Sequence, residues 1–142
     1  MVGSSVPCLI ESCGFCRANE VEELQTMKTG MTNRSYAFYV KGNRYIVRIP
    51  GEGTDRLINR AQEYAVYNAI KPLEISDAVH YFDPVTGIKI ASYLIDAHVC
   101  DGRNWDEVAK CIAALREFHS SKLHVAHSLD LWERLNFYES LW

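Results

Sequence analysis

A tight hairpin in the first third of the sequence constrains the fold more than any other stretch. Two runs rich in aromatic and β-branched residues, Ser35 to Val40 and Arg44 to Ile49, are typical of strands. Lys41-Gly42-Asn43 lies between them and supplies the positive φ angles that a tight turn needs. A polar loop, Gly30-Met31-Thr32-Asn33, leads into the first strand. The sequence therefore predicts a loop followed by a two-stranded hairpin.

The second strand carries a cation in an otherwise apolar run. Tyr45, Val47 and Ile49 share one face of the strand because side chains alternate, so Arg48 points to the other face. A guanidinium on that face needs a partner, and the segment that follows offers one.

A helix is predicted after Pro50, with Thr54 as its N-cap and Asp55 in its first turn. Glu63 lies close to the apolar side of this helix, where it can pair with Arg48. A strand cation aimed by a helix carboxylate behind a Gly-containing loop is how kinase folds hold nucleotide phosphates. The apolar positions at helical spacing are Leu57, Ile58, Ala61, Ala65, Ala69 and Ile70.

The rest of the chain predicts a second hairpin and then helices. Ala78 to Phe82 and Ile88 to Ile95 are expected strands. Asn104 starts an N-x-x-E capping pattern with Glu107, before a helix whose apolar face runs from Val108 to His119. Leu129 to Trp142 is expected to form a last helix that exposes large apolar groups. Val21 to Met27 suits either a strand or a helix, because its charged residues favour helix.

Several motifs, taken together in this order, resemble the N-terminal lobe of bacterial LicA-type choline kinases. These enzymes lie within the choline/ethanolamine kinase and aminoglycoside phosphotransferase superfamily, and the resemblance runs from about Ile10 to the C-terminus. The residues that carry it are Gly30-Met31-Thr32-Asn33, Tyr45-Ile46-Val47-Arg48-Ile49-Pro50-Gly51, Gly53-Thr54, Leu57-Ile58-Asn59-Arg60 with Glu63, Tyr81-Phe82-Asp83-Pro84 and Thr86-Gly87-Ile88-Lys89-Ile90.

The resemblance implies an α+β fold with two parts. Residues 1–95 would form a protein-kinase-like N-terminal lobe, a five-stranded antiparallel sheet with one packed helix, in which Val21 to Met27 is a strand. Residues 96–142 would form the hinge and the first helices of a truncated C-terminal lobe. ATP would be held by the loop Gly30 to Asn33 and by Arg48 with Glu63, and backbone groups of Tyr93, Leu94 and Ile95 would bind adenine.

The resemblance also places the reaction chemistry outside this sequence. In the family the catalytic Asp and the Mg²⁺ ligands come from a His-x-Asp…Asn loop and a later Asp. His127-Ser128-Leu129-Asp130 has one residue too many between His and Asp, and Asn136 is not at the family spacing. We therefore expect no catalytic residue and no metal ligand in this chain. It would be inactive alone, as an expressed fragment, a truncated gene product or half of a split protein.

Composition narrows the function class. A net charge of -3 and the lack of a dense Lys/Arg cluster argue against nucleic-acid binding. No apolar run approaches the ~20 residues of a membrane span, and an odd number of cysteines suits a reducing compartment, so we expect a cytoplasmic protein.

Two groups of residues could suggest a metal site. Cys8, Cys13 and Cys16 have a spacing found in some iron–sulfur proteins, and His119, His124 and His127 form a second loose group. Idle thiols and solvated or capping histidines are the preferred interpretation of both.

The sequence is also compatible with other functions. Arg48 and Glu63 also suit a purely structural ion pair. The chain would then be a non-catalytic module that binds a nucleotide or a partner, or a fold that docks another chain through its C-terminal apolar face. Within the enzyme hypothesis the acceptor is a small alcohol, with choline as the first choice and ethanolamine or an aminoglycoside as alternatives.

Overall fold

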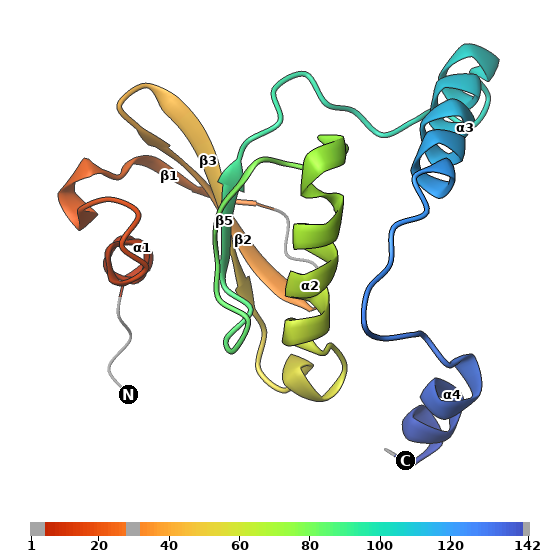
Figure 1. Ribbon diagram of the computed structural model, residues 1–142. Coiled ribbons are helices and arrows are strands. Elements are labelled where there is room, and N and C mark those ends of the chain that lie inside the picture. Colours follow the sequence, from red (N-terminus) through yellow and green to blue (C-terminus); the bar gives the residue numbers. More distant parts are fainter. Residues whose placement is uncertain (1–4, 28–31, 141–142) are drawn as a thin grey trace.

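The fold is built on one antiparallel sheet, which the computed structural model describes with its flanking helices over residues 5–27 and 32–140 (Figure 1). The strand order is β1-β2-β3-β5-β4. The α+β class and the five antiparallel strands are thus confirmed. The strands are β1 (Glu22–Thr26), β2 (Asn33–Val40), β3 (Asn43–Pro50), β4 (Val79–Phe82) and β5 (Lys89–Ser92).

Four α-helices accompany the sheet in the described part of the chain. Short 3₁₀ turns lie at Ala18–Glu20, Thr54–Arg56 and Lys71–Leu73. Figure 1 shows α1 on one side of the sheet and α2 on the other, with α3 and α4 beyond α2. The α-helices are α1 (Val6–Ser12), α2 (Arg60–Ile70), α3 (Trp105–Ser120) and α4 (Leu131–Glu139).

The predicted hairpin forms with a two-residue turn. Lys41 and Gly42 have φ angles of 51° and 77°, while Asn43 already belongs to β3. Positive φ at both turn positions matches the right-handed twist of the strands, which is why this turn closes a hairpin well. Because the turn sets the register, Phe38 lies opposite Tyr45.

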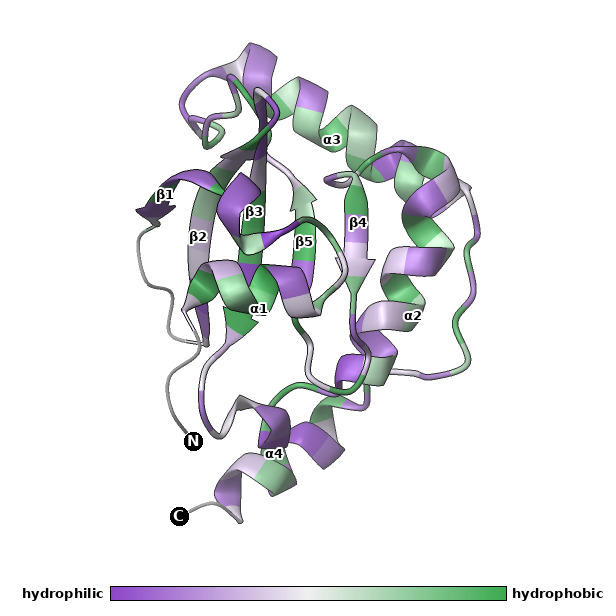
Figure 2. Cartoon of the chain, turned by 90° about the vertical axis from the view of Figure 1, so that its left-hand side faces the viewer, coloured by the Kyte–Doolittle hydropathy of each residue, from purple (hydrophilic) through white to green (hydrophobic). Residues whose placement is uncertain are grey.

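One face of the sheet is apolar and is covered by α1, which lies across the front of the strands in Figure 2. Phe38, Val47 and Ile90 are fully buried there, and Ile10 of α1 is fully buried against them. Phe15, just after α1, meets the ring of Tyr45 edge-on at a centroid distance of 4.9 Å. Burying a side chain such as Ile10 stabilises the folded state by about 1.5–3 kcal/mol. The α1 helix thus completes the main core and helps to stabilise it.

The opposite face of the sheet carries charge and is covered by α2. Arg48 and Lys89 are direct cross-strand partners on this face. Tyr64 and Tyr67 of α2 both meet the ring of Phe82 edge-on, with centroids 5.5 Å apart. Since two neighbouring cations repel each other, each needs a carboxylate, and the helix side of the sheet supplies them.

The start of α2 differs from the prediction that Thr54 caps the long helix. Thr54 begins a separate 3₁₀ turn, and α2 begins after Asn59, whose side chain accepts a hydrogen bond from the backbone N–H of Gln62 at 3.1 Å. Asn is among the best capping residues, and its extended backbone ends the preceding turn. The hydroxyl of Thr54 donates instead to the carbonyl of Gly51.

The last strand is shorter than predicted, since β5 ends at Ser92 and not at Ile95. The backbone N–H of Ser92 donates to Ala78, and that of Tyr93 donates to Arg44 at 3.0 Å. Both neighbouring strands end near there, so later residues have no strand with which to pair. Asp96 then turns the chain with a φ of 63°.

The two C-terminal helices form where predicted, and their faces are open. Asn104 caps α3 through the N–H groups of Asp106 and Glu107, and Asp130 caps α4. Neither helix, as described, contains a buried residue. The expected last helix is confirmed from Leu131 to Glu139, and residues 141–142 lie outside the described part. No helix in the described ranges combines the length and the apolar character needed to cross a membrane.

Candidate functional site

The predicted ion pair between strand and helix is present. Arg48 reaches from β3 to α2 and donates through Nη1 to Oε1 of Glu63 at 2.5 Å. Both side chains are about one-fifth exposed, so the pair sits at the margin of the interior, where a ligand can still approach the cation. The pairing that strand alternation and helix spacing predicted is confirmed.

A second arginine, which the sequence analysis did not assign to the site, also holds Glu63. Nη1 of Arg60 lies 3.1 Å from Oε2 of Glu63, and its Nη2 donates to the hydroxyl of Thr54 at 2.8 Å. The Arg60 side chain is only 6% exposed. The signal was the i,i+3 spacing of Arg60 and Glu63 on one helix, which brings such pairs together.

Gly87 completes this network from the β4–β5 turn. Its carbonyl accepts a hydrogen bond from Nη2 of Arg48 at 3.4 Å. A Cβ at Gly87 would lie 2.6 Å from Cδ of Arg60, and Gly87 has a φ of +74°. Only glycine therefore permits both the backbone conformation and the close approach of Arg60.

The electrostatics of the site favour an ionised Glu63. Burial opposes ionisation and is the largest single influence, but hydrogen bonds and charge from Arg48 and then Arg60 outweigh it, so the pKa of Glu63 lies below its usual value of 4.5. Nε of Arg48 is buried and has no hydrogen-bond partner among the described residues. Because that Nε is buried, an anion would meet the part of the Arg48 side chain that stays exposed beside its bonds to Glu63 and Gly87.

Lys89 forms a second ion pair beside the first, and the sequence analysis did not predict it. Its Nζ lies 2.7 Å from Oδ2 of Asp77 and donates to the hydroxyl of Tyr67 at 2.8 Å. Asp77 precedes β4 and Tyr67 lies on α2, so a strand, a loop and a helix meet at one ammonium. Arg48 and Lys89 together give this face of the sheet a paired row of cations.

The predicted phosphate loop is only partly described. Gly30 and Met31 lie outside the described residues. The carbonyl of Thr32 accepts a hydrogen bond from the N–H of Gly51 at 2.8 Å, and Asn33 is the first residue of β2, opposite Pro50. The end of the loop is thus tied to the end of β3, two residues beyond Arg48.

The predicted adenine-binding segment lies at the opposite end of β3. Tyr93 is bonded to Arg44 through its backbone, and the Arg44 guanidinium carbon lies 3.9 Å from the Tyr93 ring centroid. Leu94 and Ile95 follow the strand and are 58% and 73% exposed. The structure brings Arg48 and Glu63 into contact and leaves Tyr93, Leu94 and Ile95 as an open segment at the far end of β3.

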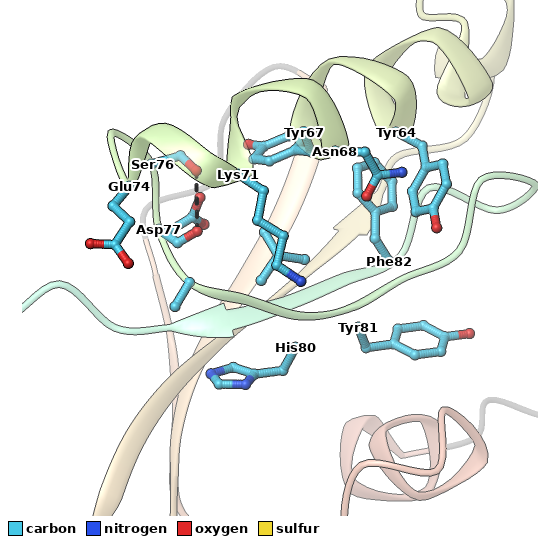
Figure 3. A pocket seen from close by; sticks show the side chains of 12 residues that line it. Tyr64, Tyr67, Asn68, Lys71, Glu74, Ser76, Asp77, His80, Tyr81 and Phe82 are labelled. Carbon is cyan, nitrogen blue, oxygen red and sulfur yellow. Dashed lines mark hydrogen bonds between the residues drawn. The ribbon is translucent and has the colours of Figure 1, made fainter.

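A separate cavity of about 530 Å³ opens between α2 and β4 (Figure 3). Tyr64, Lys71 and Phe82 line it, together with Tyr67 and Asp77, the two residues that hold Lys89. Of the residues predicted to bind a nucleotide, none that the structure describes lines this cavity. It therefore lies behind the second ion pair, outside the predicted site.

The cysteine and histidine clusters hold no ready metal site in the part that the structure describes. Over residues 5–27 and 32–140 no group of three or more His, Cys, Asp or Glu side chains is placed to hold an ion. The five cysteines are free thiols.

No protein-family model and no curated protein matches the sequence. Choline kinase LicA from Streptococcus pneumoniae matches with a TM-score of 0.79 and 28% identity, covering 96% of this chain and 47% of LicA. LicA in complex with AMP matches with a TM-score of 0.76 and 29% identity, over 98% of this chain and 50% of that chain.

A more distant match shows the fold alone. It is a choline/ethanolamine kinase family protein from Mesorhizobium loti, with a TM-score of 0.64 and 24% identity over 87% of this chain and 40% of that chain. The present chain spans about half the length of the LicA structures that it matches. It has the kinase-like fold of the choline and ethanolamine kinases, and the resemblance to LicA that its motifs indicated is confirmed in three dimensions.

Proposed function

We propose that this chain is the nucleotide-binding lobe of an ATP-dependent phosphotransferase that acts on a small alcohol, with choline as the first choice. The observation that carries the proposal is the contact between Arg48 and Glu63. It puts a strand cation that is still partly exposed on the charged face of a kinase-like sheet. Such a cation is what phosphoryl transfer requires to balance phosphate charge.

The two LicA structures that match this chain support the same proposal. A LicA structure that is 29% identical to this chain was solved with AMP, which makes a nucleotide the natural ligand for the shared fold. LicA is named a choline kinase, which makes choline the first acceptor to test. Ethanolamine follows, and aminoglycosides remain a third candidate class.

The site residues take distinct roles in this proposal. Glu63 aims Arg48, and Arg60 holds Glu63 from the other side. Residues Gly30 to Asn33 would cover the phosphates, while backbone groups of Tyr93, Leu94 and Ile95 would bind the adenine. Residues 1–95 would form the lobe, and residues 96–142 would form the hinge and the first helices of the second lobe.

Magnesium belongs to this chemistry, but the described residues do not fit it. Mg²⁺ is held by carboxylates and waters together with substrate phosphates, and ranges 5–27 and 32–140 offer no cluster of three acidic or other ligating side chains. We therefore propose that the Mg²⁺ ligands and the Asp that orients the acceptor lie in the remainder of a longer protein. The chain by itself would bind ATP weakly and transfer no phosphate.

We further propose that the protein is cytoplasmic, which the odd number of cysteines supports.

The test compares the 142-residue chain with a longer protein that contains it. Each is incubated with Mg²⁺, ATP and choline, ethanolamine or an aminoglycoside, and phosphorylated product is measured. We expect choline phosphorylation only from the longer protein. Robust turnover by the 142-residue chain would contradict the placement of the catalytic groups, and ATP binding without turnover in the longer protein would favour a non-catalytic module.

The role of Arg48 is tested in the same longer protein. Arg48→Met should lower kcat by at least tenfold, about 1.4 kcal/mol of transition-state stabilisation, while costing only about 1 kcal/mol of unfolding free energy, so the protein stays folded at the assay temperature. Arg56→Met is the matched control, because Arg56 is exposed and its side chain forms no ion pair with any residue that the structure describes. Equal losses in both variants would remove the special role of Arg48.

A further inference from the structure

Two cysteines that the proposed function does not use lie in one small region of the structure. Cys100 belongs to the linker between β5 and α3, and Cys111 lies in α3. Both are exposed and both are free thiols. Their side chains are therefore open to reagents in solution.

The linker is held along α3 by a single carboxylate. Glu107 Oε2 accepts a hydrogen bond from the backbone N–H of Asp101 at 2.9 Å and lies 3.4 Å from Nε2 of His98. Its other oxygen accepts a bond from the side chain of Asn104. Residues on both sides of Cys100 are thus fastened to Glu107.

This arrangement carries Cys100 towards Cys111. Cys111 follows Glu107 by four residues, so it lies one helical turn further along the same face of α3. Cys111 also acts on Cys100: its neighbouring thiol is the largest cause that raises the pKa of the Cys100 thiol, followed by desolvation and the charge of Cys111. The contacts of Glu107 hold the linker around Cys100 beside the first turns of α3, and the effect of Cys111 on the Cys100 thiol agrees with this placement.

We propose that Cys100 and Cys111 form a reversible oxidation site, at which a small-molecule disulfide such as oxidised glutathione converts them to an intramolecular disulfide. One cysteine thiolate attacks a glutathione sulfur, forms a mixed disulfide and releases one glutathione thiolate. The second cysteine loses its proton to solvent, attacks the protein sulfur of the mixed disulfide and releases the second glutathione. Two protein thiols are oxidised, and one glutathione disulfide is reduced to two thiols.

The other three cysteines are poorer candidates. Cys13 and Cys16 are half-buried, whereas Cys100 and Cys111 are exposed, so a dissolved disulfide reaches Cys13 and Cys16 less readily. Cys8 is exposed, but its sulfur accepts a hydrogen bond from Ser5 within its own helix end. The disulfide would close residues 100–111 into a ring and pin the linker to the first half of α3.

The test uses the full chain in glutathione redox buffers, followed by acid quenching, trypsin digestion and mass spectrometry. Trypsin separates the two cysteines, because cleavage after Lys89, Arg103, Lys110 and Arg116 places them in fragments 90–103 and 111–116. We expect these two fragments to be joined, with loss of two of the five titratable thiols, and dithiothreitol to restore both.

Two variants make the result specific. Cys8→Ser should leave the joined fragments unchanged. Cys111→Ser should abolish them and leave Cys100 as a mixed disulfide with glutathione. Separate glutathione adducts on Cys100 and Cys111 in the unmodified chain would overturn the proposal, as would a link to Cys13 or Cys16 or a link between two chains.

Discussion

Replacing Glu63 by glutamine should destabilise the fold more than removing Arg48, because Glu63 is held by two guanidinium groups. One oxygen accepts from Arg48 at 2.5 Å and the other lies 3.1 Å from Arg60. Glutamine keeps one acceptor oxygen but turns an N–H₂ group towards the other arginine. One charge-assisted hydrogen bond is lost and the remaining one becomes neutral.

The magnitude follows from these contacts. A hydrogen bond to a charged group is worth about 1.5–3 kcal/mol, and the side chain of Glu63 is 20% exposed, so water recovers part of it. We therefore expect Glu63→Gln to cost about 2–3 kcal/mol of unfolding free energy. Arg48→Met leaves the pair of Glu63 with Arg60 intact and should cost about 1 kcal/mol. Arg60→Met also breaks the bond to Thr54, so it should fall between them at about 2 kcal/mol.

Differential scanning calorimetry is the suitable assay. Trp105 and Trp132, the tryptophans of the described residues, lie in α3 and α4, so their fluorescence would not report directly on the sheet. For a domain of this size 1 kcal/mol corresponds to roughly 3–4 °C, so the expected drop is roughly 6–12 °C for Glu63→Gln. If Arg48→Met lowered the melting temperature as far as Glu63→Gln while Arg60→Met had no effect, the two-sided hold on Glu63 would be refuted.

Three further predictions follow from single features. Because folding lowers the pKa of Glu63, its contribution to the unfolding free energy is complete above pH 4.5, its ordinary pKa, and is lost as the pH falls through the lower folded pKa. The difference in melting temperature between wild type and Glu63→Gln should therefore close on acidification, and a constant difference would refute this linkage. Gly87→Ala should cost about 2–3 kcal/mol in denaturant unfolding, from backbone strain and the clash with Arg60, whereas Gly14→Ala, with a similar φ and open space, should cost only about 1. The chain should self-associate through α4, where Trp132 is 76% exposed, so Trp132→Gln should lower the mass measured by light scattering; an unchanged mass would point to another surface.

Local sequence predicted the elements whose geometry depends on neighbouring residues. The hairpin followed from alternating strand residues around Lys41-Gly42, and the start of α3 followed from Asn104 and Glu107. The pairing of Arg48 with Glu63 was also within reach, because strand alternation and helix spacing each fix the direction of one side chain. The strand β1 was not predictable in this way: only the family resemblance decided between strand and helix, because its five residues are exposed and show no alternation of buried and exposed positions.

Tertiary structure decided where other elements begin and end and which of their residues are buried. The end of β5 at Ser92 depends on where β3 and β4 end, and the separation of Thr54 from α2 depends on the hydrogen bonds of its hydroxyl to Gly51 and Arg60. Ile10 showed no sign in the sequence of being among the most buried residues.

The Arg60, Gly87 and Lys89 contacts illustrate the same division. Sequence alone determined that a cation and a carboxylate face each other between β3 and α2. Only the folded chain brought the turn at Gly87 against Arg60, and joined Lys89 to Asp77 and Tyr67. The physical reason is that backbone periodicity sets a side chain's direction within its own element, whereas its partner across the sheet depends on how strand register and helix packing bring distant segments together.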